Sequence, residues 1–412
     1  MKDVTALPDA FSDNNLEALY QLLCRPWFRR AWVVQEAVLA KTATVVAGSC
    51  RIPLLELFRA WSKEGNHWTS EQLEQIFDAS ITLETIQALR TDCEIPPGWE
   101  PGFDALLNRL GNAQASDLRD HVYAFLGLRN DPRISIAPDY TLSTSQVFTR
   151  MARAVIEGTN SLHIFRLLPK FYNARTENVR LPSWVPDWSR RNQEGWIFRD
   201  PWYCHEMHFN AAKGARHRGC QLSQLRQYEL LVSGRIIDCV TRILPTCAPM
   251  KERPPFFSLS DDQVTILDRS AYSDHTESLR KRLVTVLSAG QVGAENKVSL
   301  DGTGTLLTAE QVLRLYDDKS KHQDNLHGVD TRRRRLWHYT LIHTREEKLG
   351  LAPRLVSVGD MIAILHGLEA PVVLRQLRNG NHIVVGQCYL EDAMFGEALT
   401  WEEYEADTLT LV

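Results

Sequence analysis

The hydrophobic period changes along the chain, and this change is the strongest constraint on the fold. Up to about residue 160, apolar residues recur every three or four positions, as on the buried stripe of a helix. One such set is Phe103, Leu106, Leu107 and Leu110. After Arg335 the apolar residues fall in short, β-branched runs. A helix-rich first part followed by a strand-rich last part predicts the α+β class.

Boundary signals place several helices in the first part. Asp13 is a candidate N-cap for a helix that ends before Pro26, and the next helix is expected over Trp27–Ala40 because no breaker interrupts it. A β-branched strand over Thr42–Val46 and a helix over Pro53–Trp61 are expected next. Two later helices begin with the spacing of a capping box: Thr69 with Gln72, and Ser143 with Gln146.

The last part of the sequence predicts a small β module. A strand pattern first appears at Leu230–Leu244, and it resumes after the charged segment Asp317–Arg335. The dipeptide Asn379-Gly380 predicts a tight hairpin, because both residues tolerate positive φ. We therefore expect Arg335–Val412 to form a mostly antiparallel, barrel-like module. Its expected strands are Leu336–Ile342, Met361–Leu365, Val372–Leu377 and Ile383–Tyr389.

Charge and cysteine usage narrow the class of protein. With 47 Lys+Arg against 51 Asp+Glu the net charge is -4, which gives no global attraction for nucleic acid or an anionic membrane. The eight cysteines contain no CxxC pair, so a reducing compartment is favoured over a disulfide-bonded secreted fold. No signal segment and no apolar run of about 18 residues occurs. We expect a cytosolic protein without a membrane span or a nucleic-acid partner.

Four strings in the first part stand out: Arg25–Glu36 (RPWFRRAWVVQE), Asp117–Leu128 (DLRDHVYAFLGL), Pro138–Tyr140 (PDY) and Leu181–Ser189 (LPSWVPDWS). In this order they resemble the motifs of fungal heterokaryon incompatibility (HET) domain proteins. Three later strings resemble the tail module of many such proteins: Gly359–Leu365, Pro371–Arg375 and Val385–Tyr389. The resemblance spans nearly the whole chain and is weakest between Arg190 and Arg335.

The resemblance implies an α/β HET domain similar to the Toll/interleukin-receptor (TIR) class. Family members usually carry two further strings upstream, Leu-Ser-Tyr-x-Trp-Gly and Ile-Asp-x-x-Cys-Ile-Asn-Gln, and neither occurs here. The chain is then either a fragment or a degenerate member without the N-terminal part of the domain. We expect a partial HET domain over residues 1–128, a helical extension over 129–189, a variable middle region with a linker over 190–334, and the β module over 335–412.

Some TIR-class members cleave the nicotinamide bond of NAD with a glutamate on a helix that also bears a tryptophan. The resemblance assigns these roles to Glu36, as the catalytic carboxylate, and to Trp32, one turn earlier, as its support. Such a carboxylate would stabilise the developing oxocarbenium charge. The alternative, which we favour from sequence, is structural: Glu36 pairs with Arg29 or Arg30, and Trp32 belongs to the core.

Three other groups of residues admit a functional and a structural interpretation. His205, His208, His217 and Cys220 are weak candidates for a zinc site, and a solvated variable loop is favoured. Arg332–Arg335 is a solvated hinge rather than a nucleic-acid patch. The set Asp117, Arg119, Asp120 and His121 either contacts a ligand or locks the motif internally, with an acid as helix cap and Arg119 in an ion pair. We favour the internal lock.

The functional expectation rests on the resemblance. It implies a cytosolic signalling component of vegetative incompatibility that triggers cell death on non-self recognition, through self-association and protein partners. The alternative is a NAD glycohydrolase that uses Glu36, with NAD as a substrate. No resident cofactor is expected, because no GxGxxG, P-loop or HExxH motif occurs.

Overall fold

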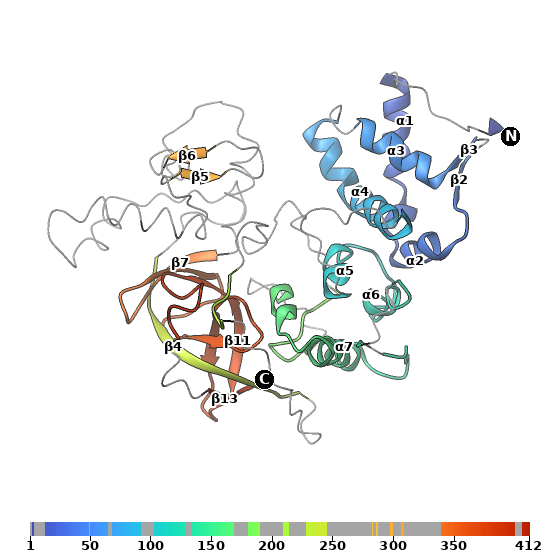
Figure 1. The fold of residues 1–412 in the computed structure, drawn as a ribbon. Helices are drawn as coiled ribbons and strands as arrows, with labels where there is room; N and C mark the ends of the chain where they lie inside the picture. Colours follow the sequence, from blue (N-terminus) through green and yellow to red (C-terminus); the bar gives the residue numbers. More distant parts are fainter. Residues whose placement is uncertain are drawn as a thin grey trace. The chain divides into compact units, whose positions relative to one another are not determined.

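The computed structural model describes two compact units (Figure 1). The first comprises Met1–Val155 with Asp187–Trp196, and the second comprises Ile156–Pro186 with Ile197–Val412. The residues described are 2–3, 13–48, 50–64, 68–91, 103–128, 133–134, 136–168, 180–189, 209–213, 228–244, 282, 286, 297–299, 306–308, 339–399 and 406–412. Their mixture of helices with a large, mostly antiparallel sheet confirms the α+β class.

The first unit is mainly helical. Its helices are α1 (Asp13–Leu23), η1 (Pro26–Arg29), α2 (Ala31–Leu39), α3 (Leu54–Glu64), α4 (Ser70–Thr91), α5 (Phe103–Arg109), α6 (Asp120–Tyr123) and α7 (Thr144–Thr159), the last of which continues into the second unit after Val155. A small sheet pairs β3 (Cys50–Pro53) with β2 (Thr44–Ala47) antiparallel and with β1 (Lys2–Asp3) parallel.

Helix α4 is central to this unit because α1, η1, α2 and α3 all pack on it. The capping box at its start is confirmed: Gln72 N donates to Thr69 Oγ1 at 3.2 Å, and Thr69 N donates to Gln72 Oε1 at 3.1 Å. The same reciprocal bonds join Ser143 and Gln146 at the start of α7. The apolar stripe of α4 is fully buried at Ile76, Ala79, Leu83 and Ile86.

The helix expected over Trp27–Ala40 is wrong as a single element. Arg30 is extended (φ -81, ψ 133) and separates the 3-10 turn η1 from α2. The reason is a tertiary bridge to Gln114: Ala31 N donates to Gln114 O at 3.0 Å, and Gln114 N donates to Arg29 O at 2.5 Å. These two bonds replace the helical bonds that an unbroken helix would make at this point.

The second unit is built on one eight-stranded sheet. Its strands are β4 (Leu230–Leu244), β7 (Tyr339–Thr344), β8 (Leu349–Pro353), β9 (Met361–Leu365), β10 (Val372–Gln376), β11 (His382–Gln387), β12 (Tyr389–Leu390) and β13 (Asp407–Leu411), in the order β12-β8-β7-β4-β13-β11-β10-β9. Because β4 also pairs with β9, five of the strands close into a hydrogen-bonded ring. The unit further contains η2 (His163–Leu167) and the pair β5 (Lys297–Ser299) and β6 (Leu306–Thr308).

The long strand β4 makes this closure, and it precedes the segment 335–412 that the sequence predicts as the β module. Its first part pairs with β13, its middle with β9 and its end with β7, always antiparallel. The change of partner from β13 to β9 occurs at Gly234, where an added Cβ would lie 2.5 Å from Ile364 O. Glycine is therefore the residue that allows the backbones to approach this closely.

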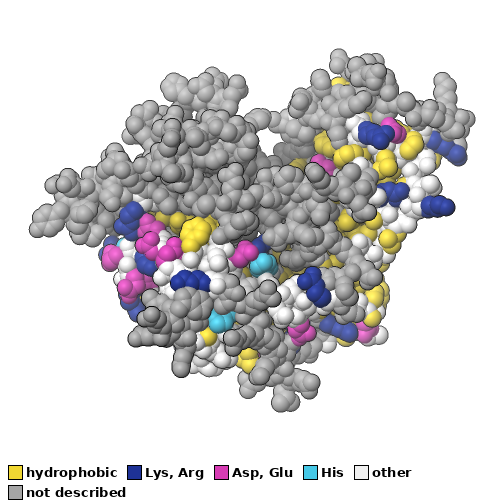
Figure 2. All heavy atoms as spheres, viewed as in Figure 1, with side chains coloured by type: hydrophobic (Ala, Val, Ile, Leu, Met, Phe, Trp, Pro, Cys, Tyr) yellow, Lys and Arg dark blue, Asp and Glu magenta, His cyan; other side chains and the backbone are white. Residues whose placement is uncertain are grey.

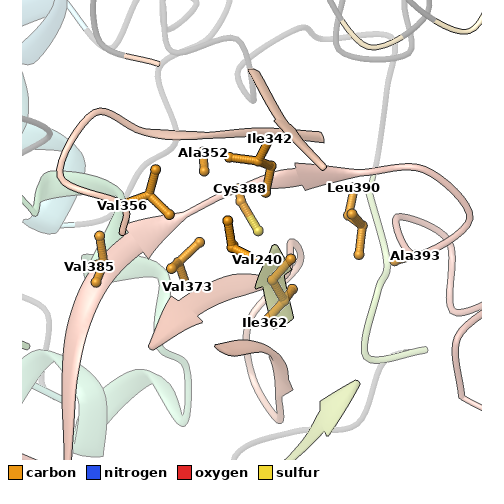
Figure 3. Packing of buried hydrophobic residues seen from close by; sticks show 10 residues of the cluster. All are labelled: Val240, Ile342, Ala352, Val356, Ile362, Val373, Val385, Cys388, Leu390 and Ala393. Atoms are coloured by element: carbon orange, nitrogen blue, oxygen red, sulfur yellow. The ribbon is translucent and has the colours of Figure 1, made fainter. Parts of the chain in front are cut away.

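An apolar cluster fills the inside of this unit (Figure 3). Its members come from β4, from each of β7 to β12 and from the loops beside them: Val240, Ile342, Ala352, Val356, Ile362, Val373, Val385, Cys388, Leu390 and Ala393. Cys388 is fully buried among them, and its burial raises the pKa of the thiol. Each large aliphatic side chain buried here contributes about 1.5–3 kcal/mol relative to exposure.

The predicted hairpin at Asn379-Gly380 is confirmed between β10 and β11. Gly380 has φ +84, and Leu377 N donates to Asn381 O at 2.8 Å across the turn.

A buried ion pair also stabilises the β unit. Asp360 is 3% exposed and accepts two hydrogen bonds from Arg375 at 2.8 Å. The hydrogen bonds that Arg375 donates to Asp360 raise the pKa of its guanidinium.

The segment Leu181–Ser189 is divided between the two units. In the second unit, Trp184 is fully buried and its indole donates to Tyr228 O at 3.1 Å. Ser183 N donates to Val412 O at 2.9 Å, so the segment is fixed to the strand region after β13. In the first unit, Trp188 is buried edge-on against Phe148. Each tryptophan is therefore a core residue of its own unit.

Candidate functional site

Three of the four strings meet at one polar cluster in the first unit, which we call the Asp120 cluster and define as Trp32, Asp117, Arg119, Asp120 and Tyr140. The Asp120 carboxylate lies at its centre. Its Oδ2 accepts the indole N–H of Trp32 at 2.9 Å, and its Oδ1 accepts the hydroxyl of Tyr140 at 2.6 Å. One carboxylate thus links α2, the start of α6 and the loop before α7.

Arg119 fixes the same loop from the other side. Its guanidinium pairs with both oxygens of Asp117, at 2.9 and 2.6 Å, and donates to Tyr140 O at 2.6 Å and Leu142 O at 2.9 Å. It also lies 5.1 Å from the centre of the Tyr140 ring. Asp117 Oδ1 accepts the backbone N–H of Arg119 at 3.0 Å as well. The ion pair is the internal lock that we favoured from the sequence. The helix cap that we expected from Asp117 or Asp120 is wrong, because the N-cap of α6 is Arg119 and no side chain caps this helix.

The loop carries its own hydrogen bonds. The hydroxyl of Tyr123 donates to Asp139 O at 3.0 Å and accepts from Asp139 N at 3.1 Å. Asp139 Oδ1 accepts from Thr141 N at 2.9 Å and from the Thr141 hydroxyl at 2.6 Å, which closes a tight turn. The rings of Tyr123 and Tyr140 meet edge to face at 5.1 Å. The PDY string is therefore held in one conformation by its neighbours.

The Asp120 cluster and the loop beside it contain several groups with a shifted pKa. The side-chain hydrogen bond from Arg119 lowers the pKa of Asp117, and those from Thr141 lower the pKa of Asp139. Burial of its hydroxyl end and the hydrogen bond to Asp120 raise the pKa of Tyr140 to about 12. The Tyr140 side chain is nevertheless 49% exposed, so the ring forms part of the surface.

Glu36 lies on the exposed side of α2, one turn after Trp32. Among the residues that the structure describes, its carboxylate makes neither the ion pair with Arg29 nor the one with Arg30. Arg29 instead donates to Gln75 O on α4 at 2.7 Å. Trp32 is only partly buried, and its indole N–H is hydrogen-bonded to Asp120. The arrangement combines a free carboxylate with a fixed aromatic residue, and a catalytic role for either stays a prediction.

The zinc candidates His205, His208, His217 and Cys220 lie outside the described residues, as do Arg332–Arg335. Within the described parts of the chain no group of three or more His, Cys, Asp and Glu residues could hold a metal ion. The described helices include none that is long and apolar enough to cross a membrane. In Figure 2, basic side chains on the visible described surface lie among acidic and apolar ones.

Sequence reasoning missed two of the contacts around α2. Tyr140 stands out in the sequence only as part of the PDY string, which does not indicate that its hydroxyl donates to Asp120. Arg90 received no role, although its guanidinium binds carbonyl oxygens at the end of α2. A tyrosine beside a loop aspartate is a weak signal, and nothing in the sequence around Arg90 indicates its distant partner.

No model of a protein family matches the chain. The chain is 23% identical over 456 aligned positions to heterokaryon incompatibility protein 6, OR allele, of Neurospora crassa. The comparison supports a fungal protein of the heterokaryon incompatibility type. It covers 92% of this chain and 66% of the relative, so the chain spans just under two thirds of the relative's length. No solved structure is significantly similar.

The heterokaryon incompatibility relative is similar over nearly the whole chain, from the helical unit to the β unit. The Asp120 cluster joins three strings by which the sequence resembles HET-domain proteins, and the Asp360–Arg375 pair joins two strings of the tail resemblance. The residues that carry the resemblance are thus largely those that hold each unit together.

Proposed function

We propose that this chain acts in fungal heterokaryon incompatibility, as a cytosolic signalling component that triggers cell death after non-self recognition. It would act by self-association and by contacts with protein partners. The observation that carries the proposal is the similarity to a heterokaryon incompatibility protein over 92% of the chain. The Asp120 cluster supports it, because strings typical of the HET family are there joined in one packed arrangement.

The domain arrangement belongs to the same proposal. Residues 1–128 would form a partial, TIR-like HET domain, 129–189 its helical extension, 190–334 a variable region and 335–412 part of a β module. The pairing of β4 with β7, β9 and β13 supports a module that also includes Leu230–Leu244.

The test is expression in a filamentous fungus from an inducible promoter. Fusion cells between an expressing strain and a panel of unlike strains are scored for uptake of a vital dye. We expect death in fusion cells with at least one unlike strain and none in fusions with an identical strain. Equal viability across the panel, with the protein present in every fusion, would contradict the proposal.

The position of the Glu36 carboxylate supports a second candidate function, the hydrolysis of NAD. The carboxylate is exposed and unpaired among the described residues, and it follows Trp32, which Asp120 fixes. In this reaction the bond between the ribose C1′ and the nicotinamide nitrogen breaks and nicotinamide leaves with the bonding electrons. Water then adds at C1′ and gives up a proton. The Glu36 carboxylate would stabilise the positive charge that develops on the ribose.

The second candidate is tested with purified protein at concentrations that allow self-association. NAD loss and free nicotinamide are measured for the wild type, Glu36→Gln and Glu17→Gln, the last changing an exposed glutamate on α1. For the wild type and Glu17→Gln we expect one nicotinamide to be released for each NAD consumed. For Glu36→Gln we expect the rate of release to be at least about 100-fold lower. Equal release by all three, or none by a folded wild type, would remove Glu36 from a catalytic role.

A further inference from the structure

The C-terminal end of α2 lacks the usual means of satisfying its last carbonyl groups. Helices commonly end on a glycine in the left-handed region, which lets backbone N–H groups turn back to these oxygens. Here Ala40 follows Leu39 with φ -65 and ψ 133, so the chain leaves the helix in an extended conformation. Its N–H bonds to Glu36 O at 3.2 Å, and the later carbonyls need another donor.

Arg90, near the end of α4, supplies that donor. Its Nη1 donates to Ala37 O, to Ala40 O at 2.7 Å and to Val38 O at 3.5 Å. Its Nη2 lies 3.5 Å from Lys41 O. One guanidinium therefore collects the carbonyl groups of the last turn of α2, 49 to 53 positions earlier in the sequence.

The chemistry of arginine suits this role. The C-terminal end of a helix carries a partial negative charge, which a cation stabilises. The planar guanidinium directs several N–H groups at once, so it fixes direction as well as charge, whereas a lysine ammonium is a flexible point charge. Arg90 thus replaces a C-cap by a tertiary contact between α4 and α2.

Glu36 lies in the turn that Arg90 holds. Its carbonyl accepts the N–H of Ala40, whose own carbonyl binds Arg90. One turn earlier, Trp32 is bound to Asp120. The helix is therefore fixed on both sides of Glu36, while the Glu36 side chain is exposed. A carboxylate on a rigidly held element, with no partner of its own in the described part of the chain, is typical of a preorganised functional group.

We propose that Arg90 is a positioning residue for Glu36: it fixes the last turn of α2 and with it the direction of the Glu36 carboxylate. The inference rests on the second candidate function, NAD hydrolysis. Arg90 would touch neither NAD nor the reacting atoms. It would act on catalysis through the orientation of the helix, which makes kcat more sensitive than KM.

The experiment compares four proteins: the wild type, Arg90→Ala, Arg90→Lys and Arg109→Ala. Arg109 is the matched control, because it is a mostly buried arginine that binds Glu84 and Thr85 on the same helix α4. Two quantities are measured on folded samples. The first is hydrogen exchange of the Ala40 amide, and the second is kcat and KM for NAD.

For Arg90→Ala we expect the Ala40 amide to exchange about tenfold faster or more, because the last turn opens more often once its carbonyls lose their donor. We expect kcat to fall about tenfold with KM within about twofold of the wild type. Arg90→Lys should give values between those of the wild type and Arg90→Ala, because lysine keeps the positive charge but lacks the several N–H donors of the planar guanidinium. Arg109→Ala should leave both readouts near the wild type.

The outcomes that overturn the inference differ from those that overturn the proposed hydrolysis. If the wild type consumes NAD and Arg90→Ala does so with unchanged kcat, Arg90 does not position Glu36. Unchanged exchange at Ala40 also contradicts the inference, whatever the kinetics. If a folded wild type consumes no NAD, hydrolysis itself fails and the positioning role fails with it. Faster exchange at Ala40 would then identify Arg90 as a helix cap only.

Discussion

The indole nitrogen of Trp32 lies 2.9 Å from Oδ2 of Asp120, although the two residues are 88 positions apart in the sequence. The other oxygen of Asp120 accepts the hydroxyl of Tyr140 at 2.6 Å. A single carboxylate therefore sets the position of the helix that carries Glu36 relative to the loop that carries the PDY string.

The Trp32–Asp120 bond should be measurable as a coupling. Trp32→Phe removes the N–H donor, and Asp120→Asn replaces the charged acceptor with an amide. We expect each change to lower the free energy of unfolding by about 1–3 kcal/mol, because the bond is charge-assisted and partly buried. In a double-mutant cycle from urea unfolding, the pair should show a coupling of about 1 kcal/mol. Strictly additive effects would contradict a direct bond.

Tyr140 should make stability depend on alkaline pH. Its pKa in the folded chain is raised to about 12 from 10.0, so the folded state holds the proton more tightly than the unfolded state. Its contribution is therefore fully present below about pH 10 and is lost as the pH rises toward about 12. The stability difference between the wild type and Tyr140→Phe should shrink over this range. A difference that stays constant would show that Tyr140 titrates normally.

The Asp360–Arg375 pair should matter more to the β unit than an exposed aspartate does. The buried Asp360 carboxylate accepts two hydrogen bonds from the Arg375 guanidinium and one from Ser357 N at 2.7 Å. Asp360→Asn removes the negative charge from this acceptor. We expect a loss of about 1.5–3 kcal/mol in the free energy of unfolding. Asp392→Asn is the control, since Asp392 is exposed with φ 51 and asparagine tolerates this conformation. Circular dichroism during denaturation measures both, and equal effects would exclude a special role for Asp360.

Gly234 should tolerate no side chain. An alanine Cβ there would meet Ile364 O at 2.5 Å and a Leu365 side-chain carbon at 2.7 Å, where β4 changes partner from β13 to β9. We expect Gly234→Ala to cost about 2 kcal/mol or more in the β unit, because backbone must move to relieve the overlap. Gly380→Asn meets no atom in its open hairpin turn but must adopt φ +84, which asparagine tolerates better than most residues, so it should cost about 1 kcal/mol or less. A thermal denaturation series that ranks the two in the opposite order would contradict the strand closure.

Local signals in the sequence predict local structure well. The capping boxes at Thr69 and Ser143 and the hairpin at Asn379-Gly380 are confirmed, because each depends on residues within three or four positions. The break at Arg30 could not be read in the same way. It depends on Gln114, a partner more than eighty positions away, whose backbone competes with the helix.

The candidate site shows the same division. The strings indicated which segments matter, and Arg119 was correctly interpreted as an internal ion pair. The expected pair between Glu36 and Arg29 or Arg30 fails because Arg29 points to Gln75 on α4. The role of Arg90 could not be predicted from the sequence. It caps a helix from a different helix, and such a contact has no characteristic residue spacing. Long-range partners of this kind are decided by the packing of the helices.

The most direct test of the proposed function is dye uptake in fusion cells that carry the wild type or Trp32→Phe at matched protein levels. The substitution keeps an aromatic ring but removes the N–H donor to Asp120, together with part of the indole ring system. We predict death in fusion cells between wild-type expressors and at least one unlike strain, and reduced death with Trp32→Phe. Full viability in every fusion that contains the wild-type protein would contradict a role in heterokaryon incompatibility.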